Sequence, residues 1–308
     1  MRSAPPQATP ASTGPPGLEI VHCGPMATVQ DRGRRGYAAL GVGRSGAADA
    51  PAAALANRLV GNDEGAACLE LTFGSATLLF HRYTRVAVTG APCLLDRAAA
   101  MNAPFTVPAG GTLTIGAPAS GVRTYVAVRG GVAVPPVLGS RSTDVLSGLG
   151  LPALSPGNLL PIGTDHSGPP PGVEVAPVNP PAAGELTVRV LAGPRADWCT
   201  PEALATLLAE PFTVSADSNR VGVRLSGPVL ARARHEELPS EGMVPGAIQV
   251  PPAGQPVVFL ADHPVTGGYP VLAVVTSADL PVLAQARPGQ RVRFRLAPGE
   301  AGQSAAAR

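Results

Sequence analysis

The chain has 308 residues, of which 45% are hydrophobic and 14% are charged, a composition typical of a globular protein rather than a disordered one. Its formal net charge is only +2, which gives no reason to expect nucleic acid or an anionic membrane as a partner. All 23 basic residues are arginine, because the sequence contains no lysine. No Walker lysine, Schiff-base lysine or biotinyl lysine can therefore come from this chain.

The length predicts two domains, and a proline-rich stretch marks the boundary between them. Residues 1–17 lack the apolar core of a signal peptide, and we expect them, together with 299–308, to be disordered tails. A first β-rich unit is expected over 18–163, a proline-rich linker over 164–185 and a second unit over 186–298. There is no long apolar run and no CxxC pair, so we expect a cytoplasmic protein with reduced thiols and no membrane span.

Short apolar segments between glycine and proline turns predict the strands of the first unit. These strands are expected over 18–23, 68–72, 77–80, 85–89, 112–115 and 124–128. One helix is predicted over 50–60, where Asp49 can cap the first turn and Gly61 can end the last one. Regularly spaced short strands of this kind are typical of a barrel or a sandwich.

The second unit repeats this alternation of short strands and few helices. Strands are predicted over 186–191, 212–215, 221–225, 257–261, 271–276 and 291–296, with a helix after Thr200 and a shorter one after Ser277. The segment 237–251 differs, because its prolines and glycines bracket Ser240, Glu241 and Gln249. A loop stiffened in this way can hold polar groups at a small-molecule site, or it can be a rigid connection across the end of a barrel.

Two polar segments of the first unit offer candidate binding groups. In segment 28–37, Gln30, Asp31 and Arg34 lie between glycines. An arginine fork binds carboxylates or phosphates, although Asp31 and Arg34 can equally form a structural bridge. Ser140 and Arg141 lie in a short turn that can bind an oxyanion or be an inert surface turn.

Two further segments can likewise be either binding sites or purely structural. Residues 45–49 precede the predicted helix, whose open N–H groups favour an anion, although Asp49 is also well suited to be a helix cap alone. Asn219 can bind an amide and Arg220 an anion, or both can be plain turn residues.

Thr266 and Tyr269 flank paired glycines that allow close approach of a backbone, and a site and a plain loop fit this segment equally. The five histidines are scattered without an HExxH motif, so no metal site is predicted.

Taken together and in order, these motifs resemble one protein family. The matching segments are 28–34, 41–49, 56–62, 69–70, 129–131, 139–143, 215–220, 238–251 and 266–270. They resemble the C subunit of 5-oxoprolinase, also called KipA or allophanate hydrolase subunit 2. They are also similar to the second half of the urea carboxylase carboxyltransferase domain (subdomain A and B type). The resemblance runs from about Leu18 to Phe294, with small departures at Ala48 and at 263–265.

The resemblance implies a mainly β fold with a few short helices and two cyclophilin-like β-barrel units. It implies a 5-oxoprolinase component that is active only in complex with the B (KipI type) and A subunits of that enzyme. That complex would use bound ATP to open 5-oxo-L-proline, a cyclic amide, to L-glutamate. Two alternatives stay open. One is the carboxyltransferase component of a biotin-dependent urea-type carboxylase, with biotin carried elsewhere. The other is a regulatory module that binds a kinase-inhibitor partner.

Within such a complex we expect this chain to supply part of a shared pocket. Asp31 and Glu241 are the predicted catalytic residues, as groups that handle a proton. The predicted substrate-binding residues are Gln30, Arg34, Ser140, Arg141, Asn219, Arg220, Ser240, Gln249, Thr266 and Tyr269. Among them, Arg34, Arg220 and Asn219 are expected to hold the anion and the amide of a small acid.

Overall fold

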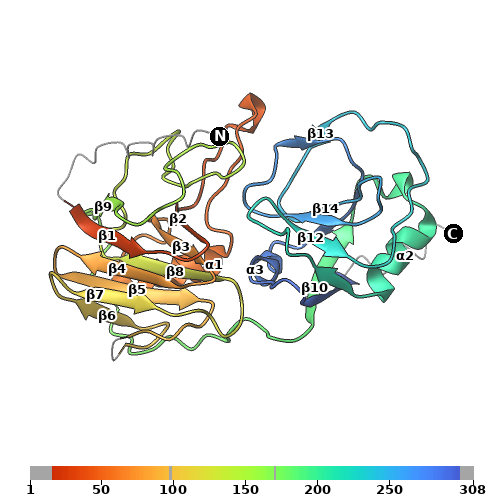
Figure 1. Cartoon of the computed structure of the whole chain (residues 1–308). Helices are drawn as coiled ribbons and strands as arrows, with labels where there is room; N and C mark the ends of the chain where they lie inside the picture. Colours follow the sequence, from red (N-terminus) through yellow and green to blue (C-terminus); the bar gives the residue numbers. More distant parts are fainter. Residues whose placement is uncertain (1–15, 97–98, 170, 299–308) are drawn as a thin grey trace, which may run out of the picture.

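The computed structural model describes residues 16–96, 99–169 and 171–298, which form two β-rich halves lying side by side (Figure 1). Within these ranges there are three α-helices and eighteen strands, so the prediction of a mainly β chain with few helices is confirmed. The predicted tails lie almost wholly outside the described residues. Only residues 16 and 17 of the first tail are described, at the start of a strand.

The N-terminal half consists of two sheets with the strand orders β7-β4-β1-β9 and β2-β3-β8-β5-β6. The first sheet contains β1 (Pro16–His22), β4 (Ala76–Phe80), β7 (Thr112–Ile115) and β9 (Leu159–Pro161). The second contains β2 (Met26–Gln30), β3 (Cys68–Thr72), β5 (Thr84–Gly90), β6 (Pro104–Val107) and β8 (Arg123–Val128). Buried side chains from both sheets, such as Leu18 and Leu69, share one core. This half is therefore a two-sheet sandwich, whereas we predicted a barrel.

Helix α1 (Ala50–Val60) covers the outer face of the second sheet. The helix begins and ends where the sequence predicts: Asp49 accepts a hydrogen bond from the backbone N–H of Ala52 at 3.1 Å, and Gly61 ends the helix at φ 77°. Leu59 packs in the same apolar cluster as Tyr125 of β8. Because β8 is covered on both faces, all six of its residues are buried.

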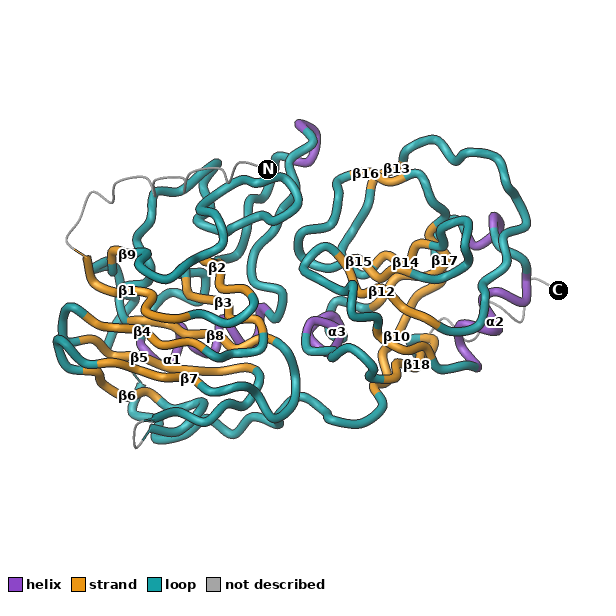
Figure 2. Tube along the Cα trace, in the orientation of Figure 1, coloured by secondary structure: helices purple, strands orange, loops and turns teal. Residues whose placement is uncertain are grey.

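The C-terminal half is a closed barrel with the strand order β10-β17-β14-β15-β12-β11-β18 (Figure 2). These strands are β10 (Leu186–Ala192), β11 (Phe212–Val214), β12 (Gly222–Ser226), β14 (Ala247–Gln249), β15 (Val257–Phe259), β17 (Val271–Val275) and β18 (Arg291–Leu296). Strands β10 and β18 pair in parallel, and the other barrel pairs are antiparallel. Barrel formation is confirmed for this half, and closure leaves no free sheet edge.

Short elements complete the C-terminal half. A two-stranded ribbon of β13 (Glu241–Gly242) and β16 (Thr266–Gly267) stands above the barrel in Figure 2. Helix α2 (Pro201–Ala209) packs against β18, and α3 (Leu280–Ala284) lies on the side of the barrel that faces the N-terminal half (Figure 1). The 3₁₀ turns are η1 (Ala38–Leu40) and η2 (Ala196–Trp198). Strand β14 lies inside segment 237–251, which we predicted as a loop. The prediction missed this strand because three residues are too few to show an alternation of apolar and polar side chains.

Three other features bear on the predictions. The described part of segment 164–185 contains no helix or strand. All four cysteines are free, and Cys68, Cys93 and Cys199 are buried. Among the described residues, no helix is both long enough and apolar enough to cross a membrane.

Candidate functional site

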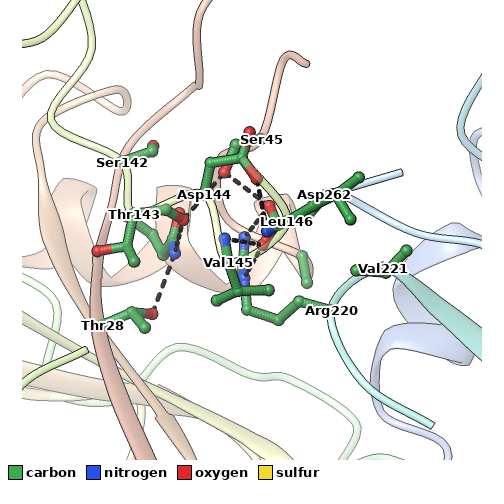
Figure 3. Close-up of polar contacts among 12 residues, drawn as sticks. Thr28, Ser45, Ser142, Thr143, Asp144, Val145, Leu146, Arg220, Val221 and Asp262 are labelled. Carbon is green, nitrogen blue, oxygen red and sulfur yellow. Dashed lines mark hydrogen bonds and ion pairs between the residues drawn. The ribbon is translucent and has the colours of Figure 1, made fainter. Parts of the chain in front are cut away.

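The junction of the two halves is built around Arg220, which enters from the turn before β12 (Figure 3). Only 1% of Arg220 is exposed. Its Nε and Nη2 donate to the two carboxylate oxygens of Asp262 at 2.8 and 2.9 Å, and Nη2 also donates to the carbonyl oxygen of Gly46 at 2.6 Å. Its Nη1 donates to Glu70 on β3 of the other half. Burial alone would lower the pKa of Arg220, but the charges of Glu70 and Asp262 raise it, so the guanidinium stays charged.

Glu70 is the acidic partner that the N-terminal half contributes. Only 1% of it is exposed, and its Oε2 accepts hydrogen bonds from the Tyr125 hydroxyl at 2.8 Å and from the backbone N–H of Ala48 at 3.0 Å. Burial alone would raise the pKa of Glu70, but the charges of Arg220 and Arg123 outweigh burial and lower it. The ionised carboxylate therefore holds the segment before α1 against the sheet.

Asp262 ties two loops of the N-terminal half to the barrel. The hydroxyl of Ser45 lies 2.6 Å from Asp262 Oδ1, and the backbone N–H of Val145 donates to Oδ2 at 3.1 Å (Figure 3). Ser45 and Gly46 have φ values of 56° and 100°, a left-handed backbone that is unfavourable for serine. A Cβ on Gly46 would lie 3.0 Å from the carbonyl oxygen of Asp31, so only glycine fits there without a shift of its neighbours.

A second connection joins the helices that face each other across the junction. Gln285, at the end of α3, accepts hydrogen bonds from the backbone N–H groups of Val122 and Arg123, both at 2.8 Å. Its Nε2 donates to Asp49 at the start of α1, also at 2.8 Å. The two halves are thus fixed to each other both at Arg220 and at Gln285.

A cleft of about 560 Å³ lies at this junction. Residues 44–48 and the first turn of α1 line one side, and Pro245, Leu260 and Leu280 line the other. The charged residues on the cleft are Arg32, Arg35, Arg44, Arg58, Asp31 and Glu64. An apolar wall opposite converging polar groups is the usual form of a small-molecule site.

Five of the predicted site residues come together in the N-terminal half, around the carboxylate of Asp31. That carboxylate accepts hydrogen bonds from the Ser140 hydroxyl at 2.6 Å, from the backbone N–H of Arg141 at 2.6 Å and from that of Gly33 at 2.7 Å. This geometry joins segments 31–33 and 140–141, far apart in the sequence, into one rigid unit. The catalytic role of Asp31 stays a prediction.

Gln30 and Arg34 complete this group. Gln30 is fully buried, and its Nε2 donates to the carbonyl oxygen of Thr143 at 2.9 Å. Arg34 is 2% exposed and donates to the carbonyl oxygens of Val137, at 3.1 Å, and of Ser142. Of the five grouped residues, Gln30 and Asp31 line the cleft, while Arg34 is directed into the loop behind it.

The other predicted residues lie elsewhere. Ser240, Glu241, Gln249, Thr266 and Tyr269 gather around the β13–β16 ribbon, and none of the five lines the cleft.

Within the ribbon group, Glu241 accepts a hydrogen bond from Arg195 Nε at 2.8 Å, and this hydrogen bond lowers the pKa of Glu241. The last two predicted residues lie in the turn before β12. Asn219 is exposed in this turn, where its Oδ1 accepts a hydrogen bond from the backbone N–H of Val221 at 2.8 Å. Arg220, expected to hold a substrate anion, instead joins the two halves through protein groups.

The structure also identifies residues that the sequence analysis did not select. Arg35 and Arg44 line the cleft, although only Arg34 of that region was predicted to bind substrate. Partial burial lowers the pKa of Arg44, and the positive charge of Arg35 lowers it further. The signal was a cluster of arginines flanking the Ser45–Gly46 turn, but spacing alone does not tell which guanidinium turns toward a cavity. In the described part of the chain, no group of three or more His, Cys, Asp or Glu side chains could hold a metal ion.

The fold and the cleft define a two-part β protein with a cavity where its halves meet. The chain belongs to the family described as "Carboxyltransferase domain, subdomain A and B", whose model matches residues 40–296. This result confirms the resemblance that the motifs indicated.

Similar proteins carry two kinds of name. The chain is 40% identical to the C subunit of 5-oxoprolinase from Escherichia coli (strain K12) over 283 residues, which cover 90% of each chain. It is 35% identical to urea amidolyase of Saccharomyces cerevisiae, with 91% of this chain but only 16% of the yeast enzyme covered. The crystal structure of Kluyveromyces lactis urea carboxylase matches with a TM-score of 0.84 at 31% identity, covering 93% of this chain and 28% of that one.

Proposed function

We propose that this chain is one component of an ATP-dependent 5-oxoprolinase. Together with the A subunit of that enzyme and its B subunit of the KipI type, it would hydrolyse 5-oxo-L-proline to L-glutamate. The observation that carries this proposal is the 40% identity to the E. coli C subunit, because that alignment covers 90% of both chains. The urea amidolyase alignment covers only 16% of the yeast enzyme, so it supports a shared domain more than a shared overall activity.

The cleft at the junction is suited to such a substrate. 5-Oxo-L-proline is a small ring with a carboxylate and an amide, and the cleft combines arginines with an apolar wall in about 560 Å³. Resonance makes the ring amide resistant to water. ATP, when bound in the complex, supplies the phosphoryl group that activates the amide oxygen. The residues of this chain would bind and orient the substrate while negative charge develops.

We assign the nucleotide to the complex rather than to named residues of this chain. The sequence has no lysine and no phosphate-binding loop of the Walker type. The shared-pocket hypothesis follows, because a chain without an evident nucleotide site needs its partners to complete the reaction.

Reconstitution tests the proposal. The purified chain is mixed with the A and B subunits, ATP and 5-oxo-L-proline, and glutamate and ADP are measured together with mixtures that omit one component. Glutamate should form only in the full mixture. Full turnover by the isolated chain would contradict the shared pocket. No glutamate in any mixture would contradict the 5-oxoprolinase assignment and favour a regulatory binding module.

A second candidate is a carboxyltransferase that acts on a urea-type amide. The similarity to urea amidolyase and urea carboxylase favours it. Biotin would then be carried elsewhere, because these 308 residues contain no lysine to attach it. Retention of the chain's complex on avidin, with bicarbonate-dependent carboxylation of urea, would support this activity. A complex that passes through avidin and leaves urea unchanged would count against it.

A further inference from the structure

The outer face of the second sheet brings two arginines together. Arg129 follows β8 directly, and its backbone N–H donates to the carbonyl oxygen of Arg85 on β5 at 2.9 Å, so the two residues lie opposite each other on neighbouring strands. Side chains alternate between the two faces of a strand. Because Ala87 and Ala127, each two positions away, belong to the cluster that packs with α1, both arginines lie on that same face. Thr106 of β6 pairs with Arg85 on its other side.

Neither arginine is neutralised by an acidic side chain in the described part of the chain. Arg129 donates from Nη1 to the carbonyl oxygen of Val60 at 2.8 Å and from Nη2 to that of Gly168 at 2.9 Å. The Nε of Arg85 is buried and has no hydrogen-bond partner among the described residues. Like charges directly opposite each other across two strands are destabilising, and a buried donor without an acceptor is unfavourable as well. An anion bound beside the two side chains would relieve both costs.

The two arginines line a cavity of about 530 Å³ that shares no lining residue with the cleft at the junction. The turn between β4 and β5 adds Arg82 and Tyr83 to its wall, and the segment after β9 adds Thr164 and His166. The Nη2 of Arg82 donates to the carbonyl oxygen of Gly163 at 3.0 Å, and Arg82 forms no ion pair with a described residue. The cavity wall therefore carries three guanidinium groups and no carboxylate.

A close approach of two backbone segments fixes the shape of this cavity. Gly130 follows Arg129 with a φ of 93°, and a Cβ at this position would collide with the carbonyl oxygen of Gly163. Only glycine allows the end of β8 to lie so near the segment after β9. Because Arg82 contacts the same carbonyl, backbone groups rather than ion pairs hold the walls of the cavity, and the charges of its arginines remain available to a ligand.

From this arrangement we infer that the cavity is a second binding site, which takes a phosphate group, either free or as the ester of a small metabolite. Arg85 and Arg129 bind the phosphate oxygens, and the hydroxyl of Thr106 donates beside them. Three cations without an acidic partner match a phosphate monoester, whose charge at pH 7 is about −1.5 to −2, better than a carboxylate. The ring of Tyr83, which is 68% exposed, can contact the rest of an ester. This site goes beyond the proposed function and does not depend on it.

Direct binding to the purified full chain tests this inference by isothermal titration at constant ionic strength, because salt screens such charges. The probes are inorganic phosphate and phenyl phosphate, and benzoate is the carboxylate control. Benzoate should bind about tenfold or more weakly than phenyl phosphate, because it offers the arginines less charge and fewer acceptor oxygens. Tighter binding of phenyl phosphate than of inorganic phosphate would identify an ester as the ligand, and equal binding would identify the phosphate group alone.

Substitution of Arg85 assigns the site. Arg85→Gln removes one of two facing cations, so without phosphate its melting temperature should equal or exceed that of the unmodified protein. The same variant should bind phenyl phosphate about tenfold or more weakly, and phosphate should no longer raise its melting temperature. The matched control is Arg224→Gln, which removes the same charge from an exposed barrel position outside the cavity and should bind normally. Arg44→Gln serves as the corresponding control for the cleft at the junction.

Several results would overturn the inference. They are the absence of binding of either phosphate, binding of benzoate as tight as that of phenyl phosphate, and unchanged binding by Arg85→Gln. Loss of phosphate binding in Arg44→Gln but not in Arg85→Gln would place the anion in the cleft and would overturn the inference as well. Glutamate formation by the reconstituted complex is a separate measurement, so the 5-oxoprolinase assignment and the phosphate site can each fail without the other.

Discussion

The two halves of the molecule are both β-rich but use their loops differently. The N-terminal half is an open two-sheet sandwich, whose segments 31–46 and 139–150 are long connections without strands. The C-terminal half is a closed barrel that offers the cleft mainly an apolar wall. The sandwich thus supplies the charged groups of the cleft, while the barrel holds the loops that carry them.

Arg220 makes the main contact through which the barrel holds the loops of the sandwich. It crosses into the sandwich to reach Glu70, while Asp262 beside it holds Ser45 and Val145. The polar loops of the sandwich therefore depend on the other half for their shape.

Replacement of Arg220 should have the largest effect. Arg220→Met leaves Asp262 buried without its cation and leaves Glu70 with Arg123 alone, at 3.4 Å, and breaking a buried ion pair costs about 3–5 kcal/mol. The free energy of unfolding can be measured by urea titration with fluorescence from Trp198, the single tryptophan. Arg224→Met on the exposed face of β12 is the matched control. A loss below about 1 kcal/mol, the range of exposed pairs, would show that the halves do not depend on this contact.

Asp31→Asn should have a smaller and more local effect. The variant weakens the hydrogen bonds from Ser140 and Arg141, and hydrogen bonds to charged groups contribute about 1.5–3 kcal/mol. Hydrogen exchange should increase in 139–143 but not in the barrel strands. Asp217→Asn, in an exposed turn of the barrel half, is the control. Equal loosening of the barrel would contradict the division of roles between the halves.

The pH dependence of stability should report the titration of His263, which lies in the barrel half. Burial lowers the pKa of His263 below its usual value of 6.5. Below pH 6.5 the unfolded chain binds a proton that the folded chain does not, so stability should fall as the pH decreases through this range. The slope from one such group is at most about 1.4 kcal/mol per pH unit. Thermal unfolding of His263→Gln should show a flatter pH profile, and exposed His235→Gln should not. Identical pH profiles of unfolding for the two variants would show that His263 does not cause the loss of stability at low pH.

Glu241→Gln should have the smallest effect. Glu241 belongs to an ion pair with Arg195 whose two side chains are 28% and 38% exposed, and such pairs add little stability. The midpoint of unfolding should match that of the unmodified protein. Glutamate production by the reconstituted complex should also be nearly unchanged, because Glu241 does not line the cleft. A hundredfold loss of activity at unchanged stability would support the predicted catalytic role and place the site on the β13–β16 ribbon instead.

Most of the secondary structure was accessible from the sequence, because it follows from local chemistry. The cap at Asp49, the glycine at Gly61 and the apolar run between them define α1 to the residue. Strict alternation of apolar and arginine residues likewise defines β18. Strands β13, β14 and β16 have only two or three residues each, so no periodic pattern could reveal them.

Whether the strands of each half close into a barrel was decided by the tertiary structure. Similar runs of short strands form a barrel in one half and two sheets in the other. Strand pairing depends on contacts between residues far apart in the sequence, and the alternation within each strand is the same in either case.

The family and the polar loops were evident from the sequence, since motif order is a property of the chain itself. The role of each arginine was not. Arg34, Arg35, Arg44 and Arg220 carry the same charge in the sequence, but the fold buries Arg220 beside Glu70, 150 positions away, and leaves Arg35 and Arg44 on the cleft. The physical reason is desolvation. A buried guanidinium must pair with protein groups, whereas one that faces a cavity keeps its charge for a ligand, and only the three-dimensional structure determines which of these applies.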